Sequence, residues 1–168
     1  SLTDFISWGV KTYPADRYGL VLWDHGAAWP GVGIDEGADP NMLNMSKLRK
    51  ALSEGISKSG IKEFAFIGFD ACLMATFEVA MTIAPFAEYM IASEELVPGH
   101  GWDYDAFKIL ASNPGTNPVD LGKAIIDGFA AQAKSQNQNS TVTLSLTDLY
   151  AISNLNRLFN TFSSKAMS

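Results

Sequence analysis

FAFIGFDAC, residues 64–72, is a run of apolar residues that ends abruptly at a carboxylate and a thiol. Nearly every position from 64 to 69 is apolar, which is typical of a strand that is covered on both faces of a sheet. The earlier run YGLVLWDHG, residues 18–26, is built in the same way and ends at a histidine. Because functional residues of an open parallel sheet gather where its strands end, we expect Cys72 and His25 to meet in space.

The rest of the chain alternates between helical and strand patterns. It predicts a helix to about Thr12, a strand at 19–23, a helix capped by Ser46 that ends at Gly60, a strand at 64–69, a helix that follows Cys72 to about Ala84, a strand at 88–92, a helix from Asn117-Pro118, a strand at 141–146 and a helix from Thr147. Strands that alternate with helices predict an α/β fold, with a mostly parallel sheet and helices on both faces.

The first helix carries its own local signals. Ser1 or Thr3 can cap its amino terminus. Its apolar residues Phe5, Ile6 and Trp8 are expected to face the core.

Length and composition narrow the class of protein. With 168 residues, of which 47% are hydrophobic, the chain can bury one substantial core, and we predict a single domain over residues 1–168. Charged residues make up only 18% and the net charge is −6, so a nucleic acid partner is not expected. No apolar run is long enough to span a membrane, and the first residues show no signal-peptide pattern.

Cys72 and His25 together predict nucleophilic catalysis. The helix predicted directly after Cys72 would place the sulfur at a helix amino terminus, where the dipole favours a thiolate. His25, 47 residues upstream, can assist ionisation of the thiol and later protonate a leaving amine. Taken singly, the cysteine reads as a buried small residue and the histidine as a strand-end residue bonded to backbone. His100 lies between two glycines in what reads as a solvated surface loop, and it is only a reserve candidate.

Neighbouring residues extend this prediction. The backbone N–H groups of Gly26 and Cys72 can point at a developing oxyanion once the two strand ends lie side by side. Strand alternation sends Asp70 to the same side as Cys72, where its carboxylate would suit a basic substrate side chain, although a turn or capping role fits the pattern equally well. Asp24 is kept outside the catalytic set because adjacent strand residues point apart.

Two further segments leave alternatives open. Trp102, in the glycine-containing segment after the third strand, can either wall a substrate groove or pack in the core. Asp35, Glu36 and Asp39 could bind calcium, but they lack the regular spacing of a known calcium loop, so no metal site is predicted.

Three segments, YGLVLWDHGAAW (18–29), FIGFDACLMATFEVA (66–80) and MIASEELVPGHGWDY (90–104), resemble the clostripain family of bacterial cysteine peptidases, which share the caspase-like fold. In the sequence, His25 and Cys72 are 47 residues apart, which is also close to the separation of about 50 residues known for caspases. The resemblance covers most of residues 2–127 and is weak beyond Asn137.

The resemblance implies a set of roles and a setting. It makes His25 and Cys72 the catalytic dyad, Gly26 the oxyanion neighbour, and Asp70 the determinant for Arg or Lys before the cut. It implies a caspase-like three-layer sandwich and a bacterial protein that is secreted or held at the cell surface. Some members of the family require calcium and others do not, so a calcium requirement stays open and no cofactor is predicted.

The family pattern also extends beyond this sequence. Its members have an additional strand upstream of residues 2–12 and continue past residue 168, which suggests an incomplete sheet and a fragment that can associate with the missing segments. Members are often activated by cleavage after a basic residue in the loop that follows the histidine. Residues 26–46 contain no Lys or Arg, so self-cleavage there is not expected.

We therefore predict a cysteine endopeptidase that hydrolyses protein or peptide substrates after Arg or Lys through a thioester. One alternative is a noncatalytic binding or surface module on the same fold, in which Cys72 would be a buried, unreactive thiol. Another is a caspase-like enzyme that prefers Asp or Asn, although Asp70 disfavours an acidic substrate residue because like charges repel.

Overall fold

The computed structural model describes residues 1–34, 42–138 and 142–167. The elements are α1 (Leu2–Thr12), β1 (Gly19–Trp23), α2 (Met45–Ser59), β2 (Phe64–Asp70), α3 (Phe77–Ile83), β3 (Ala87–Ala92), the 3-10 helix η1 (Tyr104–Lys108), α4 (Ile109–Ser112), α5 (Pro118–Ser135), β4 (Ser145–Asp148) and α6 (Leu149–Ala166). Their order confirms the predicted alternation of strands and helices.

The four strands form one sheet in the order β1-β2-β3-β4. β1, β2 and β3 run parallel, and β4 pairs antiparallel with β3. The predicted mostly parallel α/β sheet is therefore confirmed. The predicted fourth strand began at residue 141, which lies outside the described residues, and the observed strand starts later, at Ser145.

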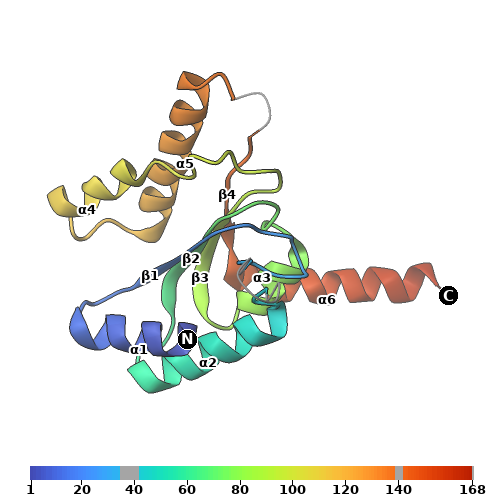
Figure 1. Ribbon diagram of the computed structural model, residues 1–168. Helices are drawn as coiled ribbons and strands as arrows, with labels where there is room; N and C mark the ends of the chain where they lie inside the picture. Colours follow the sequence, from blue (N-terminus) through green and yellow to red (C-terminus); the bar gives the residue numbers. More distant parts are fainter. Residues whose placement is uncertain (35–41, 139–141, 168) are drawn as a thin grey trace.

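Helices cover both faces of the sheet and create three layers (Figure 1). α1, α2 and α3 pack on one face, and η1, α4 and α5 pack on the other (Figure 1). The first face contains a core that includes Ile6 from α1 and Leu48 and Leu52 from α2. The second face contains a smaller core, with Leu121, Ile125 and Phe129 on the buried side of α5. These three residues recur at every fourth position, which places them on one side of the helix.

β2 lies at the centre of both cores. Its residues from Phe66 to Asp70 are all buried, as its nearly uninterrupted apolar sequence predicted. Ile67 belongs to the first core and Phe66 to the second. At Gly68 a Cβ would lie 2.5 Å from the indole of Trp102, so the absence of a side chain there lets the indole pack directly on the strand.

The predicted amino-terminal cap is confirmed for α1 and wrong for α2. Ser1 caps α1, which is one of the two predicted alternatives. The prediction of Ser46 for α2 is wrong, because Asn44 is the cap and its side-chain oxygen accepts a 2.9 Å hydrogen bond from the Lys47 backbone N–H. The cap lies two residues upstream of the predicted one, so the helix also starts two residues earlier than predicted, at Met45.

The prediction for the buried face of α1 is partly wrong. Ile6 is buried, but Phe5 and Trp8 are 56% and 53% exposed. α1 packs with the side of Thr3, Ile6 and Ser7 toward the body, and Ile6 sits against Gly55 of α2. The ring of Trp8 packs against that of Phe5, with 5.8 Å between the ring centroids.

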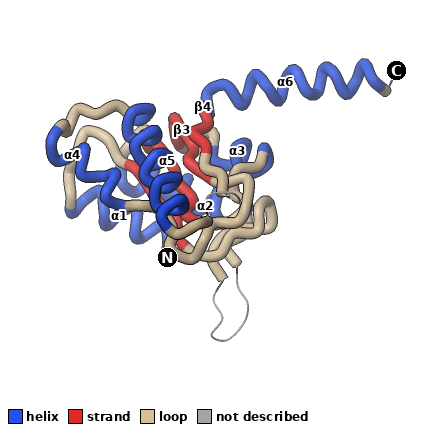
Figure 2. Tube along the Cα trace, turned by 90° about the horizontal axis from the view of Figure 1, so that it is seen from above, coloured by secondary structure: helices blue, strands red, loops and turns tan. Residues whose placement is uncertain are grey.

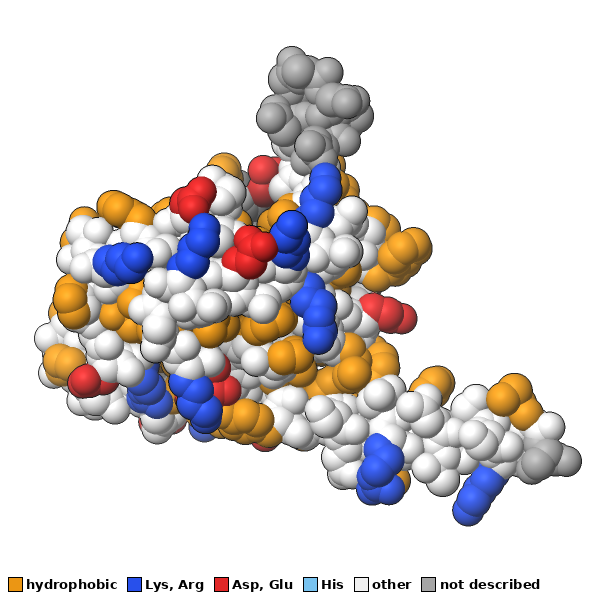
Figure 3. Space-filling model, turned by 90° about the horizontal axis from the view of Figure 1, so that it is seen from below, with side chains coloured by type: hydrophobic (Ala, Val, Ile, Leu, Met, Phe, Trp, Pro, Cys, Tyr) orange, Lys and Arg blue, Asp and Glu red, His pale blue; other side chains and the backbone are white. Residues whose placement is uncertain are grey.

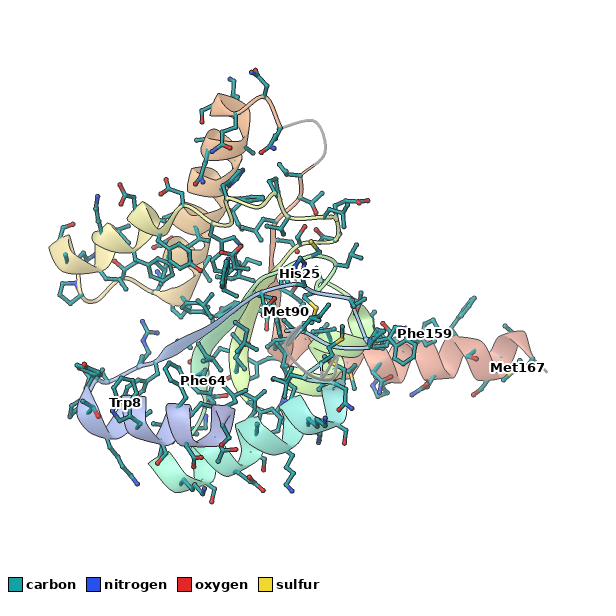
Figure 4. The ribbon with its side chains drawn as sticks, viewed as in Figure 1. Trp8, His25, Phe64, Met90, Phe159 and Met167 are labelled. Carbon is teal, nitrogen blue, oxygen red and sulfur yellow. The ribbon has the colours of Figure 1, made fainter. Side chains whose placement is uncertain are left out.

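α6 contacts α3 and β3 with its first turns and then extends away from the body of the molecule (Figures 1 and 2). The ring of Phe159 lies 6.5 Å from that of Phe77 in α3. Met167 lies at the far end of the helix (Figure 4) and is 82% exposed. The view from the side of α1 and α2 shows Lys and Arg interspersed with Asp and Glu (Figure 3), so this face carries no large patch of one charge.

Candidate active site

The carboxyl ends of β1 and β2 lie side by side. Trp23, the last residue of β1, is paired with Asp70, the last residue of β2. His25 and Cys72 each follow two residues later. At Gly26 a Cβ would collide with the backbone carbonyl oxygen of Cys72 and would lie 3.0 Å from its nitrogen. The two segments are therefore in direct contact, as the strand-end pattern predicted.

A pocket of about 270 Å³ opens at these strand ends. Its lining includes the imidazole-bearing His25, the thiol-bearing Cys72 and the carboxylate-bearing Asp70. The remaining lining residues come from the end of β1, from Ala71 and from the loop after β3: Trp23, Asp24, Ala71, Val97, Pro98, Gly99 and Gly101. A larger cavity of about 620 Å³ runs beside β1 and shares no lining residue with this pocket. We choose the smaller pocket as the candidate site because it joins an acid-base group to a nucleophile.

The surroundings of Cys72 differ from the prediction in one respect. α3 does not start next to Cys72 but at Phe77, with Thr76 as its cap, so the expected helix amino terminus at the sulfur is wrong. The chain turns instead at Leu73, whose φ is 63°. The sulfur of Cys72 is half-buried and accepts a hydrogen bond from the backbone N–H of Val97 at 3.3 Å.

The turn after Cys72 is fastened to the loop that leaves β3. The Leu73 N–H donates to the Glu95 carbonyl at 3.1 Å, and the Ala75 N–H donates to the Ser93 carbonyl at 2.9 Å. These bonds and the positive φ of Leu73 hold the chain after Cys72 in a non-helical turn, so the helix begins only at Phe77. They also fix the position of Val97 beside the thiol, so the Cys72 sulfur contacts this loop and does not lie at the start of α3.

His25 is exposed at the end of β1, in the loop at the upper edge of the sheet (Figure 4). Its backbone N–H donates to the Asp24 carboxylate at 2.5 Å, and its carbonyl accepts from the Gly33 N–H at 2.8 Å. Asp24 therefore holds the main chain of His25, which is consistent with its exclusion from the catalytic set. His25 is thus an exposed residue that also lines the pocket.

Asp70 is buried, with 3% of its surface exposed. Its Oδ2 accepts a 3.0 Å hydrogen bond from the Trp102 backbone N–H and a 3.1 Å bond from the Tyr104 hydroxyl. Burial raises the pKa of this carboxyl, while the two hydrogen bonds and the nearby His100 act in the opposite direction. The structure thus places a partly stabilised carboxylate in the pocket, two residues before the thiol.

Three pocket features were missed by the sequence analysis. Trp23 is 70% exposed and lines the pocket, Val97 supplies the donor to the thiol, and Tyr104 contacts Asp70. Burial, followed by the charge of Asp70, raises the pKa of Tyr104 to about 12, so its hydroxyl remains a donor at neutral pH. Of the three, only Trp23 carried a local signal in the sequence, since it stands two residues before His25.

Trp102 and His100 lie behind the pocket. The Trp102 side chain is 2% exposed and belongs to the second core, which is the packing alternative considered from the sequence. The expectation of a solvated His100 is wrong. It is half-buried, its Nδ1 lies 2.7 Å from the Gly101 carbonyl and 2.9 Å from the Gln132 amide nitrogen, and its ring is 6.1 Å from that of Phe129. The packing of α5 against this loop accounts for the difference.

Metal ligands do not cluster in the described parts of the chain: no group of three or more His, Cys, Asp or Glu side chains could hold an ion there. Asp35, Glu36 and Asp39, the calcium candidates, fall outside those parts. Within the same described residues, none of the helices has the length and apolar character needed to cross a membrane.

Comparisons with known proteins identify the family of this chain. The model of the clostripain family, Peptidase C11, matches residues 1–168. Clostripain from Hathewaya histolytica is 30% identical over 139 residues, which cover 71% of this chain and 25% of that protein. The chain therefore spans about a quarter of this curated relative.

Solved structures show the same fold. A secreted C11 cysteine protease from Bacteroides thetaiotaomicron, in complex with an irreversible peptide inhibitor, matches with a TM-score of 0.74 and 28% identity, over 92% of this chain and 46% of that chain. An inactive zymogen C11 protease from Parabacteroides distasonis matches with a TM-score of 0.67 and 29% identity, over 92% and 40%. The order of elements, the pocket at the strand ends and the match over residues 1–168 lead to one conclusion: this chain belongs to the clostripain family.

Proposed function

We propose that this chain carries the active site of a cysteine endopeptidase that cuts after Arg or Lys. The observation that supports this most strongly is the pocket itself, in which the thiol of Cys72, the imidazole of His25 and the buried carboxylate of Asp70 line one space. A pocket of this kind joins a nucleophile, an acid-base group and a charge that selects the substrate. Membership in a family of cysteine peptidases supports the same chemistry.

The reaction follows from the roles of these groups. The sulfur of Cys72 attacks the scissile carbonyl carbon and forms a tetrahedral intermediate, whose oxyanion is held by the backbone N–H groups of Gly26 and Cys72. His25 takes up the thiol proton and delivers it to the leaving amine as the C–N bond breaks. The resulting thioester is hydrolysed by water, which His25 deprotonates, and Cys72 is released with its proton restored.

The preference for a basic residue rests on Asp70. A buried carboxylate in a substrate pocket favours a cationic side chain over a neutral or acidic one. A neighbouring structure is described as a clostripain from Bacteroides thetaiotaomicron in complex with the peptide inhibitor BTN-VLTK-AOMK, and its 25% identity makes a lysine-accepting pocket a reasonable model for this chain.

The proposal extends to cofactor and location. The thiol and imidazole supply the nucleophile and both proton transfers, so no metal ion or other cofactor is required for the chemistry. A related C11 cysteine protease of Bacteroides thetaiotaomicron is described as secreted, and we assign secretion to this protein as well.

Hydrolysis of four matched fluorogenic peptides, ending in Arg, Lys, Asn or Asp, tests the function. Turnover is expected for Arg and Lys peptides only, and Cys72→Ala is expected to abolish it. Modification of Cys72 by iodoacetamide, followed by mass spectrometry, is measured in parallel. Cleavage after Asn or Asp, or turnover that survives in Cys72→Ala, contradicts the proposal. An unreactive thiol together with no turnover of any peptide favours the noncatalytic module instead.

A further inference from the structure

The two carboxylate oxygens of Asp70 are not equivalent. Oδ2 accepts hydrogen bonds from the Trp102 N–H and the Tyr104 hydroxyl. Oδ1 is buried and has no hydrogen-bond partner among the residues that the structure describes. An ionised carboxylate offers about four lone-pair sites, two on each oxygen. Two donors therefore saturate Oδ2, and Oδ1 is the oxygen left to accept from a ligand.

An unpartnered buried carboxylate oxygen indicates a ligand of positive charge. Buried polar atoms are nearly always hydrogen-bonded, and a buried carboxylate without a partner destabilises the protein. Asp70 is 3% exposed and lines the same pocket as Cys72. A cation bound at Oδ1 satisfies both the hydrogen bond and the charge.

The two basic side chains need different things from a carboxylate. The guanidinium of arginine is a planar fork that bonds best to both oxygens at once. The ammonium of lysine is a point charge that can bond to a single oxygen. A carboxylate with one saturated oxygen therefore loses more of its binding energy with a guanidinium than with an ammonium ion.

We propose that Tyr104 is a specificity-determining residue, which fills the second lone pair of Asp70 Oδ2 and thereby favours lysine over arginine in the pocket. The inference rests on the proposed function, since it names which of the two basic residues the site prefers. Trp102 also donates a hydrogen bond to Oδ2, but it does so through its backbone N–H, so this bond does not depend on the identity of the side chain. The Tyr104 hydroxyl is the side-chain donor that a substitution can remove.

The surroundings of Tyr104 keep its hydroxyl in place. Its ring is stacked on that of Phe107, with centroids 5.8 Å apart and planes inclined by 16°, and it lies 6.5 Å from the ring of Trp102. On the other side, a Cβ at Gly101 would lie 2.6 Å from Oδ2 and 3.1 Å from Oδ1 of Asp70. The carboxylate is thus enclosed between the Gly101 backbone and the Tyr104 hydroxyl, which limits its rotation.

Tyr104→Phe is the decisive variant, because it removes the hydroxyl and keeps the stacked ring. The probes are n-butylammonium and n-butylguanidinium, which carry the two cationic groups on equal alkyl chains. Their dissociation constants are measured by NMR titration, followed at the backbone amide signals of Gly101 and Trp102. Tyr13→Phe, which removes a phenol that is 65% exposed at the end of α1, is the matched control.

The wild-type chain is expected to bind the ammonium ion at least as tightly as the guanidinium. In Tyr104→Phe the affinity for guanidinium relative to ammonium is expected to rise about tenfold, as for one gained hydrogen bond to a charged group. The ratio of the two constants is the informative quantity, because a change in the charge or exposure of Asp70 affects both cations alike. Tyr13→Phe is expected to leave the ratio unchanged.

Three results overturn the inference: tighter binding of guanidinium by the wild-type chain, an unchanged ratio in folded Tyr104→Phe, or no binding of either cation by the wild-type chain. None of these measurements depends on turnover, and they are repeated in Cys72→Ala. If the ratio shifts as expected but no peptide is cleaved, the inference about Tyr104 holds and the proposed peptidase function fails. If peptides are cleaved after Arg and Lys but the ratio does not move, the function holds and the role of Tyr104 is wrong.

Discussion

Gly26 and Cys72 touch through their main chains: a Cβ at position 26 would collide with the Cys72 carbonyl oxygen. This contact joins the loop that carries the histidine to the turn that carries the thiol. It makes the relative position of His25 and Cys72 depend on a residue without a side chain. Any atom added at this position must push the two strand ends apart.

We expect Gly26→Ala to lower both stability and activity. Overpacking of a close contact costs about 1–3 kcal/mol of folding free energy. A displacement of about 1 Å between catalytic groups can lower the rate roughly 100-fold. Thermal unfolding and the kcat/KM for Arg and Lys peptides measure the two effects.

Gly99→Ala is the matched control for this prediction. Gly99 lines the same pocket, but a Cβ there has no atom within 4 Å. Its substitution is therefore expected to leave stability within about 1 kcal/mol of the wild type. Equal effects of the two substitutions would show that the contact between Gly26 and Cys72 does not position the site.

Asp70→Asn is expected to reduce kcat/KM for Arg and Lys peptides by about 100-fold, because loss of one partner of a buried charge pair weakens binding strongly. The asparagine side chain keeps the size of the aspartate and can still accept from the Trp102 N–H. Asp127→Asn, an exposed substitution on α5, serves as the control. If Asp70→Asn keeps full activity toward basic peptides, the Asp70 carboxylate does not determine the specificity.

The binding of n-butylammonium is expected to weaken as the pH falls through the pKa of Asp70. Burial raises this pKa above its usual value of 3.8, so the loss of affinity begins at a higher pH than for an ordinary aspartate. The other groups that act on this carboxyl are Tyr104, which stays protonated because its pKa is about 12, and His100. His100→Gln, titrated in parallel, separates its charge from that of Asp70. An affinity that is constant down to pH 3.8 contradicts the prediction.

The positions of the first three strands and of α5 follow closely from the sequence. β1 and β2 are apolar runs with a sharp polar end, and Asn117 and Pro118 mark the start of α5 unambiguously. The positions of these elements depend on neighbouring residues in the chain, so they can be predicted from a single sequence. The start of α3 was missed although Thr76, a good capping residue, stands at it, because the apolar run after Cys72 masked the signal.

The contacts that shape the pocket could not be predicted in the same way. Asp70 and Tyr104 are 34 residues apart and Cys72 and Val97 are 25 apart, and each pair meets only after the loop from β3 folds back over the sheet. No periodicity or spacing encodes such a contact. Trp102 illustrates the same limit, since Gly68, 34 residues earlier on β2, provides the space in which its indole packs.

Removal of divalent ions is expected to leave peptide turnover unchanged, since the thiol and imidazole carry out the chemistry between them. Turnover of the Lys peptide is measured after dialysis against EDTA and again after calcium is restored. A loss of activity in EDTA that calcium reverses would show that an ion is needed after all, and would direct attention to the acidic residues Asp35, Glu36 and Asp39.

Asp70→Asn is further expected to stabilise the protein at neutral pH. Because the folded-state pKa of Asp70 is raised by burial, its protonated form favours the folded state, and this contribution is complete below the unfolded value of 3.8 and is lost as the pH rises through the folded pKa. At pH 7 the wild-type chain therefore holds an ionised carboxylate that opposes folding, and the neutral amide removes this charge. Denaturant unfolding of both chains at pH 7 and at pH 3.5 measures the difference. The gain in stability should be present at pH 7 and absent at pH 3.5. The contrary result is a variant that is less stable than the wild type at pH 7 but equal to it at pH 3.5. It would mean that the ionised carboxylate stabilises the fold and is not kept there for the substrate.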